Sequence, residues 1–264
     1  MQIWQTILIG LVQGFTEFLP VSSSGHIYLL TNILGIPTTG GEYMTISVFF
    51  HLCTLVPVVI VLWKEIIGLF KKPFKKFTYL ILATIPAGIV GVVYTVVGGD
   101  EMFGDNYLYF LSCFFLVTAV IMFITEKLAK KKNPQGELSY KTSLIMGAFQ
   151  AFGTLPGISR SGSVLTGGTI AGLNNKENAS FCFLMSIPLI LGSALVEGID
   201  VVQNGFGNIL VVPMLIGGVV AMISGYVAVK FMLNIIRKAN YKYFSAYLVV
   251  LATVVIILKA TAVL

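Results

Sequence analysis

The sequence has 264 residues, of which 56% are hydrophobic and 11% are charged, and its formal net charge is +6. Soluble domains carry about 25% charged residues, so this composition excludes an ordinary soluble protein and predicts an integral membrane protein. The polar stretches between the apolar runs are too short to fold separately. We therefore expect a single membrane domain over residues 1–264.

A helix needs about 20 mainly apolar residues to cross the hydrocarbon core of a bilayer. The segments that satisfy this condition are residues 44–63, 78–97, 106–126, 179–197, 208–234 and 243–262. Regions 2–34 and 142–173 are also apolar, but Pro, Gly and Ser interrupt them at FLPVSSSGH and LPGISRSGS. We therefore predict an all-α integral membrane protein with six transmembrane helices and two re-entrant helical hairpins.

The basic residues concentrate in three stretches. Residues 64–77 contain five Lys and one Glu, residues 126–141 five Lys and two Glu, and residues 230–242 three Lys and one Arg without an acid. The acidic residues of other connections are Asp100, Glu101, Asp105, Glu197 and Asp200. Because Lys and Arg mark cytoplasmic loops, we assign the three basic stretches to the cytoplasm. Their dispersal over three loops argues against nucleic-acid binding.

This assignment determines how the two interrupted regions enter the membrane. With the basic stretches inside, region 142–173 must enter and leave on the cytoplasmic side. Region 2–34 is interpreted as a hairpin that enters from outside, since it lacks basic residues and the acidic Glu42 follows it. The two hairpins are thus expected to approach each other from opposite faces of the bilayer.

The two halves of the chain show a weak internal repeat. An offset of 137 residues aligns identical residues at five of the thirteen positions from Gln13 to Gly25. The aligned pairs are Gln13 with Gln150, Phe15 with Phe152, Ser22 with Ser159, Ser24 with Ser161, and Gly25 with Gly162. Each half, about 1–130 and 138–264, contains one hairpin and three crossings, so the second half is inverted. Inverted repeats bring their broken helices to a shared site near the bilayer midplane.

Glu17 and Arg160 are charged residues deep within the interrupted regions. A charge at the bilayer centre costs about 2.5–3.5 kcal/mol on insertion scales, so each residue indicates a functional site. The alternative is a buried ion pair that only holds the two halves together. Both interpretations require the two side chains to have partners.

The stretch PGISRSG predicts a phosphate-binding site. A helix is expected to start near Gly162, and free N–H groups at a helix start favour an anion. Ser159 and Ser161 add hydroxyl donors, while the Arg160 guanidinium can hold two phosphate oxygens. In SSSGH, Ser22, Ser24 and Gly25 repeat the pattern and predict a facing anion site.

The first hairpin also contains candidate catalytic groups. Ser23 occupies the position of Arg160 in the repeat, and His26 follows three residues later. We expect Ser23 as the nucleophile with His26 as its base, although the sequence leaves open which of the two becomes phosphorylated. Gln13 and Glu17 share a helix face and form a partial shell for a divalent cation, Mg²⁺ or Ca²⁺.

Other residues are assigned to packing. Cys53, Cys113 and Cys182 are isolated in apolar segments and support neither a disulfide framework nor a metal cluster. His51 is interpreted as a hydrogen-bonded core histidine. The small residues Gly217, Ala221 and Gly225 predict a helix-packing face.

QGFTEFLPVSSSGH and, some 130 residues later, LPGISRSGSVLTGG resemble the motifs of the undecaprenyl-pyrophosphate phosphatase family, the bacitracin-resistance type. The resemblance covers essentially the whole chain. It implies removal of the terminal phosphate of undecaprenyl pyrophosphate, in the bacterial plasma membrane, with the site open to the outer face. Glu17, Ser23, His26 and Arg160 match the family's catalytic set. The family often has Glu where this chain has Gln13, so cation affinity should be lower here.

The expected partners are a polyprenyl pyrophosphate lipid and the bilayer, with no nucleic acid. The sequence leaves open a homodimer, the identity of the cation and the prenyl chain length. The alternative function is a lipid-phosphate transporter or flippase, since inverted repeats with broken helices are also a transporter architecture. A purely structural membrane subunit would not explain two buried charges.

Overall fold

The computed structural model describes residues 2–36, 41–97, 104, 106–132, 134–204 and 211–261. Within these ranges the chain is helical apart from short connections and one isolated β-bridge. The helices are α1 (Ile3–Phe18), α2 (Ser23–Ile33), α3 (Gly41–Val61), α4 (Trp63–Leu69), α5 (Lys75–Val96), α6 (Tyr107–Lys132), α7 (Tyr140–Phe152), α8 (Arg160–Ile170), α9 (Asn175–Leu184), α10 (Ser186–Asn204), α11 (Val211–Lys238) and α12 (Lys242–Ala260).

The described residues contain five helical segments that are long and apolar enough to cross a membrane, or six if α3 and α4 form one broken span. The axes of α3 and α4 differ in direction by 86°. Each predicted segment overlaps one of these helices. The chain is therefore a multi-pass membrane protein.

The structure divides the predicted single segment 179–197 between two helices, because α9 ends at Leu184 and α10 begins at Ser186. Pro188 explains this break. It donates no backbone hydrogen bond, and its ring clashes with the carbonyl group four residues earlier, which belongs to Leu184.

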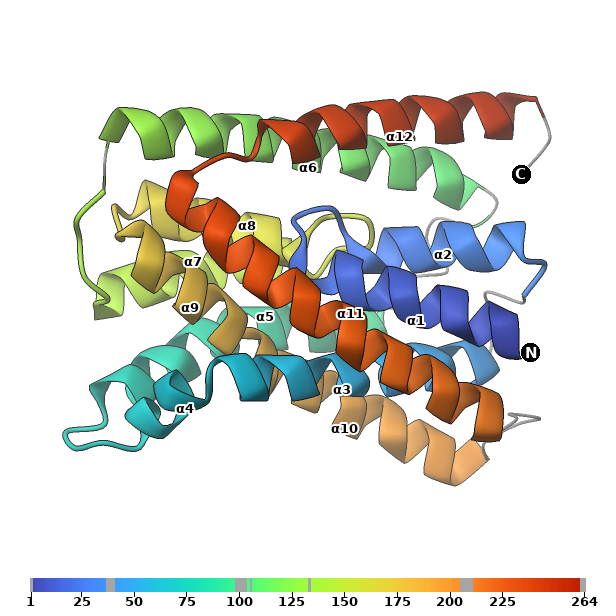
Figure 1. The fold of residues 1–264 in the computed structure, drawn as a ribbon, viewed down its shortest axis with the longest axis horizontal. Coiled ribbons are helices and arrows are strands. Elements are labelled where there is room, and N and C mark those ends of the chain that lie inside the picture. Colours follow the sequence, from blue (N-terminus) through green and yellow to red (C-terminus); the bar gives the residue numbers. More distant parts are fainter. Residues whose placement is uncertain are drawn as a thin grey trace.

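Both interrupted regions form pairs of short helices in contact, α1 with α2 and α7 with α8. Pro20 breaks the first pair, since a residue before proline avoids the helical conformation, and Leu19 is extended at ψ 144°. Gly157 turns the second at φ +84°. Figure 1 shows the loops of the two pairs close together in the middle of the molecule, reached from opposite ends.

Helix α1 packs against α11 through small residues, which confirms the predicted packing face. A side-chain carbon added at Gly10 would lie 2.1 Å from the Gly217 carbonyl oxygen, and one at Gly14 would lie 2.5 Å from that of Ala221. No larger residue fits between these backbones. The close approach fixes the position of α1 along α11. It therefore also fixes the position of the polar residues near the carboxyl end of α1.

The pairing of helices from the two halves is regular. Helix α1 packs on α11 and α7 packs on α5, while α6 packs on α12 and α3 on α10. In Figure 1, α6 and α12 run side by side along one edge of the molecule. The two halves therefore contribute matching helices to each contact.

Glu126 ties α12 to α6. One carboxylate oxygen accepts hydrogen bonds from the backbone N–H groups of Tyr241, at 2.6 Å, and Lys242, at 2.5 Å. The other accepts one from Lys130 Nζ at 2.6 Å. A carboxylate at a helix start accepts hydrogen bonds from free N–H groups, and its negative charge is attracted to the positive end of the helix dipole. This contact holds the first turn of α12 in place beside α6.

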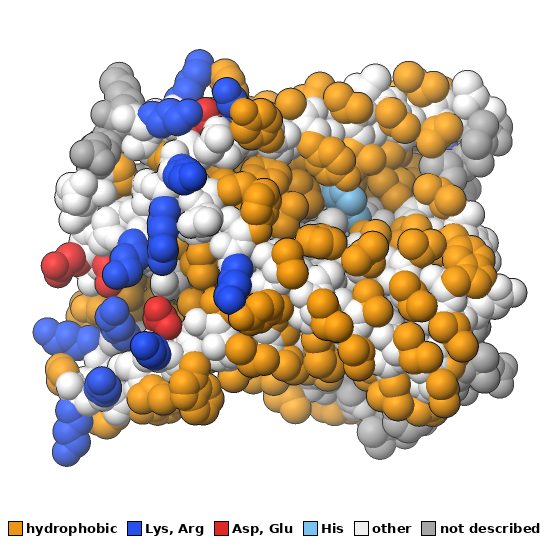
Figure 2. Space-filling model, in the orientation of Figure 1, with side chains coloured by type: hydrophobic (Ala, Val, Ile, Leu, Met, Phe, Trp, Pro, Cys, Tyr) orange, Lys and Arg blue, Asp and Glu red, His pale blue; other side chains and the backbone are white. Residues whose placement is uncertain are grey.

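The basic residues gather at one end of the molecule. Figure 2 shows Lys and Arg side chains at the end where α4, α7 and α9 lie in Figure 1, while hydrophobic side chains cover most of the remaining face. The residues Asp100, Glu101 and Asp105 lie outside the described part of the chain, as do the side chains of Glu42, Glu197 and Asp200. The three cysteines are free, with Cys53 and Cys182 buried and Cys113 exposed.

Candidate functional site

The tips of the two hairpins touch. Ser161, in the first turn of α8, donates a hydrogen bond from Oγ to the Leu19 carbonyl oxygen at 3.1 Å. A side-chain carbon added at Gly162 would lie 3.2 Å from Cβ of Pro20. Residues more than 130 positions apart in the sequence are thus brought into direct contact.

An ion pair joins the hairpins beside this contact. Arg160 Nη2 donates to Oε1 of Glu17, which lies on the last turn of α1. The Glu17 side chain is 3% exposed and that of Arg160 is 14% exposed. The charges predicted to be buried therefore neutralise each other, which reduces the cost of removing them from water.

The second oxygen of Glu17 also has donors. Ser23 Oγ donates to Oε2 at 2.7 Å, and Gln13 Nε2 donates to the same atom at 3.0 Å. The α-helix brings Gln13 and Glu17 to one face, as their spacing predicts. Glu17 is therefore held by groups from α1, α2 and α8.

Ser22 and Tyr247 hold His26. Nδ1 of His26 lies 2.7 Å from the Ser22 carbonyl oxygen and Nε2 lies 2.7 Å from the Tyr247 hydroxyl. Because a carbonyl only accepts, Nδ1 carries the proton; in the neutral ring Nε2 then accepts from Tyr247. Ser22 is strained, with φ +71°, as often occurs at functional sites.

This geometry differs from the expected pairing of Ser23 with His26. Ser23 bonds to Glu17, while the His26 ring nitrogens face Ser22 and Tyr247. The difference arises because the strained Ser22 directs its carbonyl to the His26 ring and Ser23 begins α2 beside the end of α1. In this arrangement, the carboxylate and not the imidazole accepts the Ser23 hydroxyl hydrogen bond.

The predicted phosphate-binding residues lie at the starts of α2 and α8. Ser159 is buried and accepts a hydrogen bond from the Gly162 N–H at 3.1 Å, so it caps α8. Ser22 caps α2 in the same way through Gly25, at 3.4 Å. Ser24 is exposed and lies next to Ser22. The loops are therefore stabilised by their own serines, and the Ser24 hydroxyl lies 3.4 Å from that of Ser22.

The donor set for a cation is small. Among the described residues, no group of three or more His, Cys, Asp or Glu side chains could hold a metal ion. Both oxygens of Glu17 accept hydrogen bonds, and the Gln13 amide nitrogen faces them. One carboxylate and one amide still suit Mg²⁺, which usually takes its other ligands from water and substrate phosphates.

Two residues at the site were not predicted to belong there. His51, on α3, forms the expected hydrogen bond, to the Ser47 carbonyl, and also places Nε2 3.4 Å from Oε2 of Glu17, so it lies at the site. Tyr247 contacts His26 from α12, and their rings stack with centroids 5.7 Å apart. Neither residue belongs to a polar motif, so only a three-dimensional arrangement reveals them.

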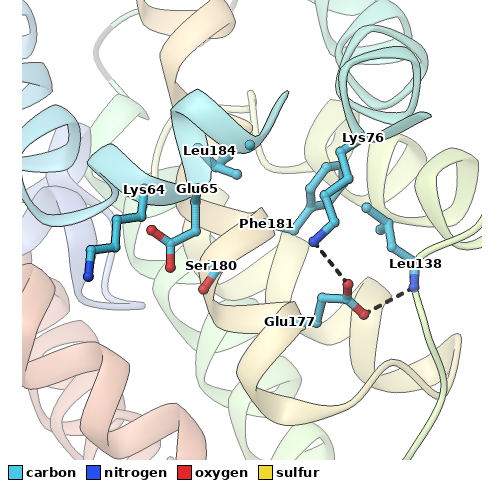
Figure 3. Close-up of a pocket in the computed structure, with 9 residues that line it drawn as sticks. Lys64, Glu65, Lys76, Leu138, Glu177, Ser180, Phe181 and Leu184 are labelled. Carbon is cyan, nitrogen blue, oxygen red and sulfur yellow. Dashed lines mark hydrogen bonds and ion pairs between the residues drawn. The ribbon is translucent and has the colours of Figure 1, made fainter. Parts of the chain in front are cut away.

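A separate pocket lies at the basic end. Its volume is about 260 Å³, and Figure 3 shows Lys64 and Glu65 on one side of it with Lys76 and Glu177 on the other. Lys76 Nζ lies 3.5 Å from Glu177, whose other oxygen accepts from the Leu138 N–H at 3.2 Å. None of the predicted site residues lines this pocket, so it is distinct from the hairpin site.

Comparison with known proteins identifies the family of the chain. Residues 6–254 match the family described as bacitracin resistance protein BacA. An undecaprenyl-diphosphatase of Halothermothrix orenii is 36% identical over 263 residues, which cover 98% of each chain. One from Carboxydothermus hydrogenoformans is 36% identical over 265 residues, again 98% of each, and one from Bacteroides fragilis is 36% identical over 98% of this chain and 99% of its own. The chain therefore belongs to the bacitracin resistance protein BacA family.

Proposed function

We propose that the protein is a membrane phosphatase that removes the terminal phosphate of undecaprenyl pyrophosphate and so recycles the lipid carrier of cell-wall synthesis. The contact of Arg160 and Ser23 with one buried carboxylate, Glu17, is the observation that supports it most directly. The names of full-length relatives also support it. A polyprenyl tail gains about 0.8 kcal/mol per buried methylene, so such a substrate stays in the bilayer and requires a site within it.

In the proposed reaction, Ser23 is the nucleophile. Its Oγ attacks the terminal phosphorus while Glu17, which already accepts its hydrogen bond, takes the proton. The bond between this phosphorus and the bridging oxygen breaks, and undecaprenyl phosphate leaves. Water then hydrolyses the phosphoserine and releases inorganic phosphate. His26, fixed by Ser22 and Tyr247, assists proton transfer to the leaving oxygen or from this water.

Arg160 is proposed to hold the diphosphate. Its guanidinium reaches the tip of the first hairpin and can neutralise charge that develops on the transferred phosphoryl group. The N–H groups at the starts of α2 and α8 and the exposed Ser24 hydroxyl add donors on the same side. Ser159, Ser161 and the close-packed glycines maintain the shape of these loops.

A divalent cation, Mg²⁺ or Ca²⁺, is proposed to bind at Glu17 with Gln13. It would neutralise part of the diphosphate charge. Since Glu17 accepts from Arg160 and Ser23 in the free protein, the cation has to replace one of these donors. We expect this exchange only when the diphosphate is present to supply the remaining oxygen ligands.

We propose that the membrane arrangement has six crossings and two re-entrant hairpins, in inverted repeats of about 1–130 and 138–264. The pairing of α1 with α11 and of α7 with α5 supports the repeat, because each hairpin packs on a helix of the other half. The lengths of the hairpin helices, from 11 to 16 residues, support partial crossings.

The proposed location is the bacterial plasma membrane, with the basic end in the cytoplasm and the active site open to the outer face. The gathering of Lys and Arg at one end supports this orientation. The first hairpin, with Ser23 and His26, enters from the other end. The transporter alternative has no support from the relatives, which are named for the phosphatase.

The orientation predicts the labelling of single cysteines in intact cells. In a Cys113→Ser background, an impermeant thiol reagent should label Gly104→Cys, because the proposed orientation puts the connection between α5 and α6 outside. It should label Lys71→Cys only after the membrane is permeabilised. Labelling of Lys71→Cys alone in intact cells would reverse the proposed orientation.

The catalytic assignment predicts the effect of two substitutions on phosphate release from undecaprenyl pyrophosphate in detergent. Arg160→Ala and Ser23→Ala should each lower the rate about 100- to 1,000-fold, because transition-state stabilisation or the nucleophile is lost. Lys141→Ala, an exposed change at the basic end, is the control and should keep normal activity. Near-normal rates for folded Arg160→Ala protein would remove Arg160 from its proposed role.

The cation proposal predicts that a chelator stops phosphate release and that Mg²⁺ or Ca²⁺ restores it. Gln13→Glu should lower the cation concentration needed for the half-maximal rate, because a second carboxylate binds a hard cation more strongly than an amide. Full activity of metal-free protein in the presence of the chelator would contradict a cation at Glu17.

A further inference from the structure

Both ring nitrogens of His51 have partners at the site. Nδ1 lies 2.7 Å from the carbonyl oxygen of Ser47, one turn earlier on α3, so Nδ1 must donate its proton there. This bond aims Nε2 at Oε2 of Glu17, 3.4 Å away. Because a carboxylate only accepts, Nε2 carries a proton as well, so His51 is an imidazolium that forms an ion pair with Glu17. The ring is 25% exposed, whereas the carboxylate that it faces is 3% exposed. The third helix of the chain therefore contributes to the site between the two hairpins.

The proposed reaction requires some hydrogen-bond partners of Glu17 to move, whereas others can keep their positions. Arg160 must turn to the diphosphate, and Ser23 must give its proton to Glu17 as its oxygen bonds to phosphorus, so neither residue fixes the position of Glu17 throughout the reaction. His51 does not have to move, because Ser47 anchors its ring. Carboxylates that bind a cation or act in catalysis are usually held by hydrogen bonds from neighbouring residues, which gives His51 a specific task.

We propose that His51 is a positioning residue that holds the Glu17 carboxylate in place when Arg160 and Ser23 engage the substrate. This inference rests on the proposed phosphatase activity. His51 touches neither phosphate nor nucleophile and acts through Glu17. The role differs from that of a packing histidine, since it needs a donor aimed at Oε2 and not merely a ring of suitable volume.

Steady-state kinetics of two His51 variants test the proposal. His51→Ala should lower kcat by about 10- to 100-fold, the usual effect of losing a residue that orients a catalytic group, with a much smaller change in KM. His51→Gln should recover most of the rate, because its amide N–H can donate to Glu17. Leu52→Ala, the adjacent exposed position on α3, is the matched control and should behave as the unchanged protein. Normal kcat for His51→Ala, or equal loss in both His51 variants, would overturn the proposal.

Coupling to Glu17 gives an independent test. In Glu17→Gln protein, adding His51→Ala should reduce the residual rate by far less than it does in the presence of Glu17. An equal fold-loss in both backgrounds would show that His51 does not act through the carboxylate.

An activity-independent measurement separates this inference from the proposed function. The infrared carboxylate band assigned to Glu17, by difference against Glu17→Gln, should shift in His51→Ala and not in Leu52→Ala. An unchanged band would reject the His51 contact even if phosphate release is normal. Absence of phosphate release by the unchanged protein, with a shifted band in His51→Ala, would reject the phosphatase and retain the contact.

Discussion

The buried ion pair between Glu17 and Arg160 constrains the rest of the structure. Neither charge is stable alone in an apolar interior, and removing one partner of such a pair typically costs about 3–5 kcal/mol. The pair forms only if the tips of both hairpins meet, and this requires the close packing of α1 on α11 and of α7 on α5. Gly10 and Gly217 thus help to position the site by allowing α1 and α11 to pack closely, although they lie far from it along the helices.

The two hairpins share a design but differ in their chemistry. Both carry a serine cap at the start of the second helix, Ser22 in one and Ser159 in the other. Gln13 has a carboxylate partner one turn later, whereas Gln150, which the sequence offset aligns with it, has Thr154 there, and its buried amide has no hydrogen-bond partner among the described residues. In the proposed mechanism, the first hairpin therefore supplies the carboxylate and the nucleophile, and the second supplies the guanidinium that binds phosphate.

Much of this arrangement could be predicted from sequence, since length and apolarity identify spanning helices and a charge in an apolar segment demands a partner. The need for partners at Glu17 and Arg160 could therefore be predicted, and the structure pairs them with each other. Pattern alone could not predict which donor faces which acceptor. The hydrogen bond from Ser23 to Glu17 depends on the strained backbone at Ser22, and His51 approaches from a helix with no polar motif. Local spacing favoured His26 as the partner of Ser23, but the fold placed the carboxylate closer.

The central claim, that the hairpin tips meet inside the protein, is tested most directly by a disulfide between them. The added Cβ at Gly162 would lie 3.2 Å from Cβ of Pro20, near the roughly 3.5–4.5 Å range of disulfides. With Cys53, Cys113 and Cys182 replaced, the pair Pro20→Cys and Gly162→Cys should form an intramolecular disulfide on mild oxidation, detected by mass spectrometry of the linked peptides. Folded protein in which both thiols stay free under the same conditions would contradict the meeting of the two hairpins.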